Sequence, residues 1–209
     1  ATILEFDENN HLKDVLVDPQ ISGECNMWLE MFIISRDFLK KIVFEAASRN
    51  QSSFTREILQ GKKDEYKIMG YEHKGIFTRI DSVQSYYNAN QMLLETEKRN
   101  ALFVKNMPIY TKIGDNGPVK YGLDSSIKNS LIADGCVIEG TVENSILFRG
   151  VKVGKGTVVK NCVLLQGTKV GSNCSISYVI TDKNVEVSND KVLTGSETYP
   201  LYIGKEGKI

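Results

Sequence analysis

The chain has 209 residues, which is enough for one or two domains. Lysine plus arginine and aspartate plus glutamate number 26 each, so the net charge is zero, and no basic run suggests nucleic-acid or anionic-membrane binding. No stretch approaches the roughly 18 apolar residues of a membrane span, and no basic-then-apolar leader opens the sequence, so we expect a cytoplasmic protein.

The first part of the chain predicts alternating strands and helices. Short strands are expected at 2–6 and 12–17, and Pro19 ends the second. The apolar run 31–34 predicts a third, buried strand, and Ser35 is expected to cap a helix. The buried face of this helix is expected to contain Phe38, Leu39, Ile42, Val43 and Ala46.

A further strand is predicted at 65–69, followed by one longer helix at 82–100. Asp81 or Ser82 caps this helix in the prediction. Its buried face is expected to contain Val83, Tyr86, Tyr87, Leu93 and Leu94. Residues 107–122 carry turn signals, which predict a linker. A phosphate-binding loop is not expected there, because no helix follows the segment.

The last ninety residues repeat one phrase four times. The copies begin at Asn129, Asn144, Asn161 and, in a worn form, Ser177, so their starts lie 15, 17 and 16 residues apart. Helical repeats need roughly 33 to 47 residues, whereas a coil of short strands fits this period. The spacing therefore predicts a β-solenoid, in which aliphatic residues of successive coils stack on one another.

Within each coil, aliphatic residues recur about every six positions, which predicts the flat sides of a triangular coil. Gly135, Gly150 and Gly167 are expected at corners. The interior is predicted to contain Ile132, Ile138, Val153, Val159, Leu165 and Val170. The segment 199–203 is expected to form a closing strand.

The sequence contains four cysteines and no Cys-x-x-Cys pair. Cys136, Cys162 and Cys174 lie inside the repeats, where other copies have small residues, so burial as small apolar side chains is expected. Cys25 precedes the repeats, and both histidines are distant from the four thiols in sequence. We therefore expect free thiols, typical of a reducing compartment, and no bound metal.

Three segments resemble the C-terminal half of the ADP-glucose pyrophosphorylase family, whose members make ADP-glucose from glucose 1-phosphate and ATP. They are 77–90 (FTRIDSVQSYYNAN), 108–111 (PIYT) and 125–180. The resemblance implies the C-terminal part of a Rossmann-like nucleotidyltransferase domain at 1–107, whose N-terminal half is absent. A linker at 108–122 and a left-handed parallel β-helix at 123–209 would complete an α/β plus β-solenoid fold.

The family's functional positions carry different residues in this chain. Asp18 aligns with the lysine that grips the sugar phosphate, and a carboxylate there would repel phosphate. Trp28 and Glu30 align with the small residues that line the glucose pocket. Arg79 aligns with the aspartate that binds Mg²⁺, a cation that demands oxygen ligands. The resemblance therefore implies no catalytic residue, cofactor or metal in this chain.

We expect a non-catalytic, regulatory D-type subunit of this enzyme in bacterial glycogen biosynthesis. Its partner would be a catalytic subunit in a hetero-oligomer, with homo-oligomers forming in isolation. One alternative is a catalytically active glucose-1-phosphate adenylyltransferase, and another is a nucleotidyltransferase for a different sugar. A hexapeptide-repeat acyltransferase is another, although such enzymes use a histidine on the coils and neither His11 nor His73 lies in the repeats.

Overall fold

The computed structural model describes residues 1–20 and 22–209. The chain forms two compact units, Ala1–Lys74 and Gly75–Ile209, and each is considered by itself. The division lies inside the region 1–107 that the sequence predicted as one domain, because residues 75–107 are compact with the β-helix. No helix within the described residues is long and apolar enough to cross a membrane.

The first unit begins with an antiparallel hairpin at the two strand positions predicted. β1 (Thr2–Phe6) pairs with β2 (Leu12–Val17), with a register irregularity near the turn. The carboxylate of Asp7 accepts hydrogen bonds from the N–H groups of Asn9 and His11, at 2.9 and 2.8 Å, and so closes the turn. Val15 of β2 is fully buried at the centre of this unit's core.

The predicted helix is present as α1 (Arg36–Ser48), and its N-cap is Ser35, as expected. Ile42 is the buried residue of this helix, but Val43 is 55% exposed. The prediction that Val43 is buried is wrong. The buried stripe of α1 is narrow and contains Phe38, Leu39 and Ile42, and Val43 lies beside this stripe on the exposed side.

Two predicted strands are absent from the first unit. Residues 31–34 form no strand, and Ile33 is fully exposed. Residues 65–69 are turn and coil, with a single bridge between Met69 and His11. A π-helix at Phe54–Gln60, capped by Ser53, was not predicted. Short apolar runs do not specify a strand by themselves, and here Phe32 stacks on Phe54 instead of entering a sheet.

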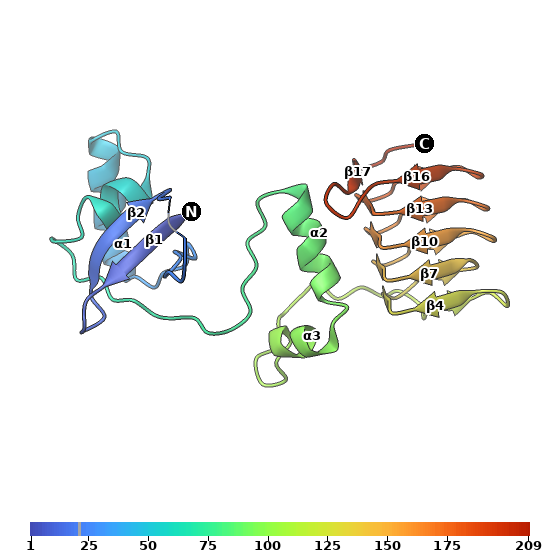
Figure 1. Cartoon of the computed structure of the whole chain (residues 1–209), viewed down its shortest axis with the longest axis horizontal. Helices are drawn as coiled ribbons and strands as arrows, with labels where there is room; N and C mark the ends of the chain where they lie inside the picture. Colours follow the sequence, from blue (N-terminus) through green and yellow to red (C-terminus); the bar gives the residue numbers. More distant parts are fainter. Residues whose placement is uncertain (21) are drawn as a thin grey trace. The chain divides into compact units, whose positions relative to one another are not determined.

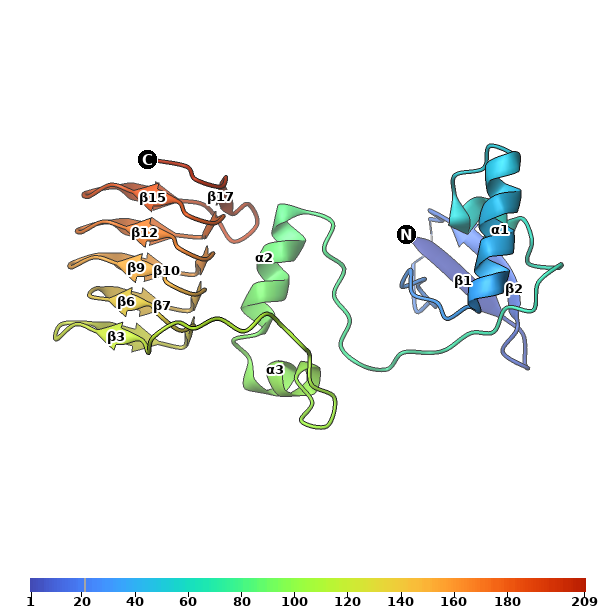
Figure 2. The ribbon, with the colours of Figure 1, turned by 180° about the vertical axis from the view of Figure 1, so that it is seen from behind.

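The second unit contains the predicted parallel β-helix, formed by three sheets of five strands each. The orders are β16-β13-β10-β7-β4, β17-β14-β11-β8-β5 and β15-β12-β9-β6-β3, with every neighbouring pair parallel. Figures 1 and 2 show the rungs stacked one upon another. The strands are β3 (Lys120–Tyr121), β4 (Ser126–Lys128), β5 (Leu131–Ile132), β6 (Val137–Ile138), β7 (Thr141–Glu143), β8 (Ile146–Leu147), β9 (Lys152–Val153), β10 (Val158–Lys160), β11 (Val163–Leu164), β12 (Lys169–Val170), β13 (Ser175–Ser177), β14 (Val179–Thr181), β15 (Glu186–Val187), β16 (Val192–Thr194) and β17 (Leu201–Ile203).

Equivalent apolar residues stack along the interior of the β-helix, as the repeat predicted. Val153 stands in register with Ile138 on one side and Val170 on the other. The predicted interior residues Ile138, Val153, Val159 and Val170 are at most 3% exposed, and Ile132 packs against the same core at its edge. The three cysteines of the repeats are buried, and Cys136 and Cys162 are fully enclosed.

Two details of the predicted register are wrong. Leu164, not Leu165, points into the β-helix, and Leu165 belongs to a second apolar cluster outside it. The fourth copy begins at Tyr178, not at Ser177, because Ser177 pairs with Lys160. Tyr178 has φ of 53°, a conformation that Asn fills in the other copies and that disfavours a bulky residue.

The corners of the coils have left-handed backbone conformations. Gly135, Gly150 and Gly167 have φ near +70°, so the prediction that they form corners is confirmed. A second corner has Asn129, Asn144, Asn161 and Tyr178 at φ between 43° and 53°. Asn is the residue other than glycine that adopts this conformation most readily.

Two helices precede the β-helix in the second unit. α2 (Val83–Met92) begins with a capping box, in which Ser82 and Ser85 satisfy each other's N–H groups, and α3 (Thr96–Leu102) follows after a turn. The predicted single helix at 82–100 is therefore divided at Leu93–Glu95, and Val83 is 45% exposed. Both views show α2 beside the rungs (Figures 1 and 2).

Tyr87 joins α2 to the β-helix. Its ring is buried with Val163 and Ile180 on the outer face of the sheet formed by β5, β8, β11, β14 and β17. Its hydroxyl donates to the main-chain oxygen of Asn161 at 3.0 Å, and burial raises the pKa of this hydroxyl. The helix thus covers an apolar sheet face that water would otherwise reach.

Candidate functional site

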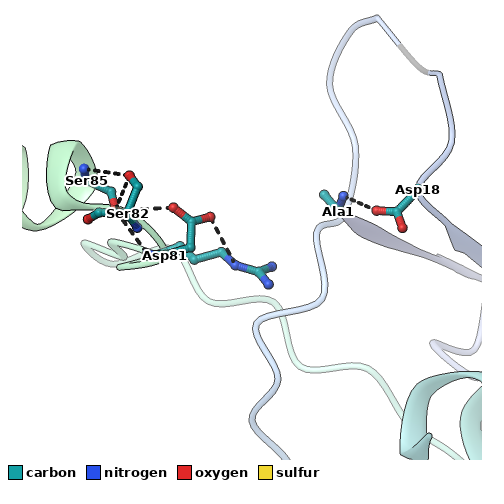
Figure 3. Close-up of polar contacts among 6 residues, drawn as sticks. Ala1, Asp18, Asp81, Ser82 and Ser85 are labelled. Atoms are coloured by element: carbon teal, nitrogen blue, oxygen red, sulfur yellow. Dashed lines mark hydrogen bonds and ion pairs between the residues drawn. The ribbon is translucent and has the colours of Figure 1, made fainter. Parts of the chain in front are cut away.

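Three of the four residues that the sequence analysis aligned with functional positions of the family lie in the first unit. Asp18 is largely exposed, has φ of 50°, and its carboxylate lies 2.7 Å from the α-amino group of Ala1 (Figure 3). Trp28 is partly buried against the core around Val15 and stacks on Phe32 at 6.3 Å. Glu30 is exposed, with φ of 60°.

Trp28 is therefore a packing residue in this fold. Its indole occupies space against the hairpin, and its N–H group on the main chain donates to the carbonyl of Thr2 at 2.9 Å. Phe32 continues the stack onto Phe54 of the π-helix, with ring centroids 4.6 Å apart. An aromatic column of this kind fills the volume that small residues at the same positions would leave open.

Arg79, the fourth position, lies in the second unit, just before α2. Its Nε is 3.7 Å from the carboxylate of Asp81. Asp81 also accepts a hydrogen bond from the hydroxyl of Ser85 at 3.2 Å, and its main-chain N–H donates to the same hydroxyl at 3.0 Å (Figure 3). The carboxylate of this motif is thus engaged by an arginine and by the first turn of α2.

The described residues contain no group of three or more histidine, cysteine, aspartate or glutamate side chains that could hold a metal ion. Burial raises the pKa of the Cys162 thiol to about 12 and also raises that of Cys136, so neither is a reactive thiolate at neutral pH. His11 lies in the hairpin turn of the first unit, 3.6 Å from Asp7.

A hollow of about 420 Å³ lies on the outer face of the sheet formed by β3, β6, β9, β12 and β15. Its charged side chains include Lys152, Lys169 and Glu186, and Lys169 forms a 2.7 Å ion pair with Glu186. This lysine lowers the pKa of Glu186 below its ordinary value. Part of the charge on this face is thereby neutralised within the chain.

A larger hollow of about 690 Å³ lies between α2 and the asparagine corner of the β-helix. The lining combines apolar side chains, such as Met92 and Leu94, with several amides. Asn88 and Gln91 come from α2, while Asn129, Asn144 and Asn161 come from three successive rungs. The sequence repeat identified these asparagines as the first residue of each copy, but did not predict that they face a helix.

Comparisons with known proteins agree with the architecture. A family described as the GlmU-like C-terminal hexapeptide region matches residues 119–198. The glycogen biosynthesis protein GlgD of Bacillus subtilis is 41% identical over 177 residues, which cover 85% of this chain and 51% of that protein. GlgD of Geobacillus stearothermophilus is 38% identical over 116 residues, which cover 44% of this chain and 34% of that protein.

A glucose-1-phosphate adenylyltransferase of Mycoplasma mobile is also similar, at 32% identity over 161 residues, or 76% of this chain and 42% of that protein. The chain spans about half the length of these relatives, or less. The resemblance that the sequence motifs indicated is thus confirmed.

Proposed function

Because the chain resembles the C-terminal half of GlgD proteins and of glucose-1-phosphate adenylyltransferases, we propose that it is part of a non-catalytic subunit in bacterial glycogen biosynthesis. The subunit would assemble with a catalytic glucose-1-phosphate adenylyltransferase and alter its activity. The catalytic partner would convert glucose 1-phosphate and ATP to ADP-glucose.

The contact between Arg79 and Asp81 carries this proposal. Transfer of a nucleotidyl group depends on cations that neutralise developing phosphate charge, and Mg²⁺ requires oxygen ligands. In this chain a guanidinium group aligns with the family's metal ligand, and the nearby carboxylate lies 3.7 Å from that group. A fixed positive charge in this position would repel a divalent cation.

The packing of Trp28 supports the same conclusion for the sugar pocket. Its indole forms part of the aromatic column with Phe32 and Phe54, at the position where the family has small residues. Replacing it with a small residue would leave a void in the first unit. The side chain thus has a structural role that is incompatible with an open glucose pocket.

The β-helix supports the proposal of assembly. Residues after β17 cover one end, where Ile209 exchanges main-chain hydrogen bonds of 3.0 and 2.8 Å with Glu186 and Ser188. At the other end, β3, β4 and β5 have a strand neighbour on one side only within the part of the chain that the structure describes. Leu123 is fully exposed there and Tyr121 is 57% exposed. Open edges with apolar side chains favour association with another subunit.

An assay of ADP-glucose formation tests the proposal. The full-length protein that contains this chain, the catalytic partner from the same organism, and their mixture are each supplied with glucose 1-phosphate, ATP and Mg²⁺. We expect no turnover by the first alone, and more turnover by the mixture than by the partner alone. Robust turnover by the protein alone would refute the absence of catalysis, and a merely additive mixture would refute regulation.

A pair of variants tests the location of the contact. Leu123→Lys puts a charge at the open end of the β-helix, and Val192→Lys puts one at an apolar position on the last rung that is 73% exposed. We expect the first variant to lose stimulation of the partner and the second to retain it. Equal loss in both would show that the open end is not the contact.

A further inference from the structure

The hollow between α2 and the asparagine corner belongs wholly to the second unit, and nothing in the proposed function uses it. Its amides repeat along the β-helix axis. Asn129, Asn144 and Asn161 occupy equivalent positions on successive rungs, which in parallel sheets lie about 4.8 Å apart. The Nδ2 group of Asn129 donates to Oδ1 of Asn144 at 2.8 Å, which aligns these two amides.

The backbone conformation of the corner does not by itself require asparagine. At another corner of the same coils, the left-handed positions are filled by Gly135, Gly150 and Gly167. Glycine adopts this conformation at less cost than asparagine. Asn184, with φ of 58°, fills the next position of that glycine corner, so the coils accept either residue there. The amides at the corner facing α2 therefore add hydrogen-bonding groups that glycine at the same positions would lack.

Helix α2 contributes further amides and one buried donor without a partner. Gln91 lines the hollow, while its Nε2 atom is shielded from solvent and has no hydrogen-bond partner among the described residues. An unsatisfied buried donor costs free energy that an acceptor on a ligand would recover. The terminal torsion of glutamine is broad, so its amide can turn toward the hollow at little cost.

The charges around the hollow indicate the class of ligand. The acidic and basic side chains that line it are Glu95, Glu197 and Lys98, two acids and one base. A phosphate or other anion would find little to neutralise it there. Amides both donate and accept hydrogen bonds, as sugar hydroxyl groups also do, and the ring of Tyr178 offers an apolar surface beside them.

We propose that this hollow binds a neutral oligosaccharide, whose successive sugar units contact successive rungs of the asparagine corner. The repeat of identical amides fits a ligand that is itself a repeating chain. The volume of about 690 Å³ is within the usual range of ligand sites. The inference does not depend on the proposed absence of catalysis, and its failure would leave that proposal unchanged.

The test is calorimetric titration of the full chain with maltoheptaose, cellopentaose and inorganic phosphate. We expect at least one of the two oligosaccharides to bind and phosphate not to compete. Asn144→Gly keeps the left-handed backbone favourable while it removes one amide. It should weaken binding roughly three- to tenfold, the loss of about one hydrogen bond. Gln91→Leu should weaken it similarly.

Asn173→Gly is the matched control, because Asn173 has φ of 57° at a corner that does not line the hollow. It should alter stability as Asn144→Gly does and leave sugar binding unchanged. Absence of binding at millimolar oligosaccharide, equal loss of affinity in both glycine variants, or displacement of the sugar by phosphate would each overturn the proposal.

Discussion

Replacing Val153 with aspartate tests the register of the β-helix. Val153 is 1% exposed and lies between Ile138 and Val170 in the parallel sheet of β9. The aspartate carboxylate would enter a column of aliphatic side chains. The adjacent residue, Lys152, points outward and is exposed, so Lys152→Asp introduces the same side chain one position away on the opposite face.

The cost at Val153 has two parts. Burial of a valine side chain contributes about 1.5 to 3 kcal/mol, which the variant loses. A buried carboxyl group without a hydrogen-bond partner adds about 2 to 3 kcal/mol. The sum, about 3.5 to 6 kcal/mol, is a large part of the roughly 5 to 15 kcal/mol that stabilises a typical domain. Lys152→Asp should change the free energy of unfolding by about 0.5 kcal/mol or less.

The cost should also depend on pH. Burial favours the neutral acid, so the pKa of the new carboxyl would lie above its unfolded value of about 3.9. A raised pKa of an acid destabilises the fold increasingly as pH rises above the unfolded value. The destabilisation should therefore be larger at pH 7 than at pH 4.

Urea unfolding followed by far-ultraviolet circular dichroism measures both variants at the two pH values. A Val153→Asp chain that unfolds like the parent, or a Lys152→Asp chain that is the less stable of the two, would show that the strand faces are reversed. A destabilisation equal at both pH values would show that the carboxyl is not buried.

Two further predictions concern individual side chains. A thiol reagent should modify the exposed Cys25 in the folded chain and reach the other three cysteines only in denaturant. Rapid modification of more than one cysteine in the folded chain would contradict the packed interior. Hydrogen bonds from Lys128 and then Lys160 lower the pKa of Glu143, so a carbon-detected titration should find its midpoint below the ordinary value of 4.5. The ion pairs of Glu143 should stabilise the fold above about pH 4.5, and this stabilisation should be lost as pH falls through the lowered pKa. If the titration midpoint of Glu143 is the same in Lys128→Gln as in the parent, the pair between Lys128 and Glu143 is not formed.

The repeat in the sequence was sufficient to predict the β-helix. Each coil places equivalent residues directly above one another, so the period of the sequence is the period of the structure. The positions of Ile138, Val153 and Val159 followed from this spacing alone. The corner glycines followed as well, because a sharp turn with positive φ has few candidate residues.

The first unit was predicted less well because its patterns are local and short. The strand expected at 31–34 rested on a short run of apolar residues, and the burial of Val43 rested on the spacing of apolar residues along one helix face. Whether such a residue is buried depends on what packs against it. The stack of Trp28, Phe32 and Phe54 joins residues up to 26 positions apart, and no local pattern indicates it.

The sequence by itself determined the repeating architecture, the buried thiols and the resemblance that suggests a glycogen-related subunit. Only the tertiary structure decided which leucine of the pair Leu164 and Leu165 is interior, and that α2 lies against the asparagine corner. Stacking within the coils is a short-range, periodic constraint that each repeat carries. The contact between Tyr87 and Asn161 joins residues 74 positions apart, so its partners are fixed only when the whole unit has folded.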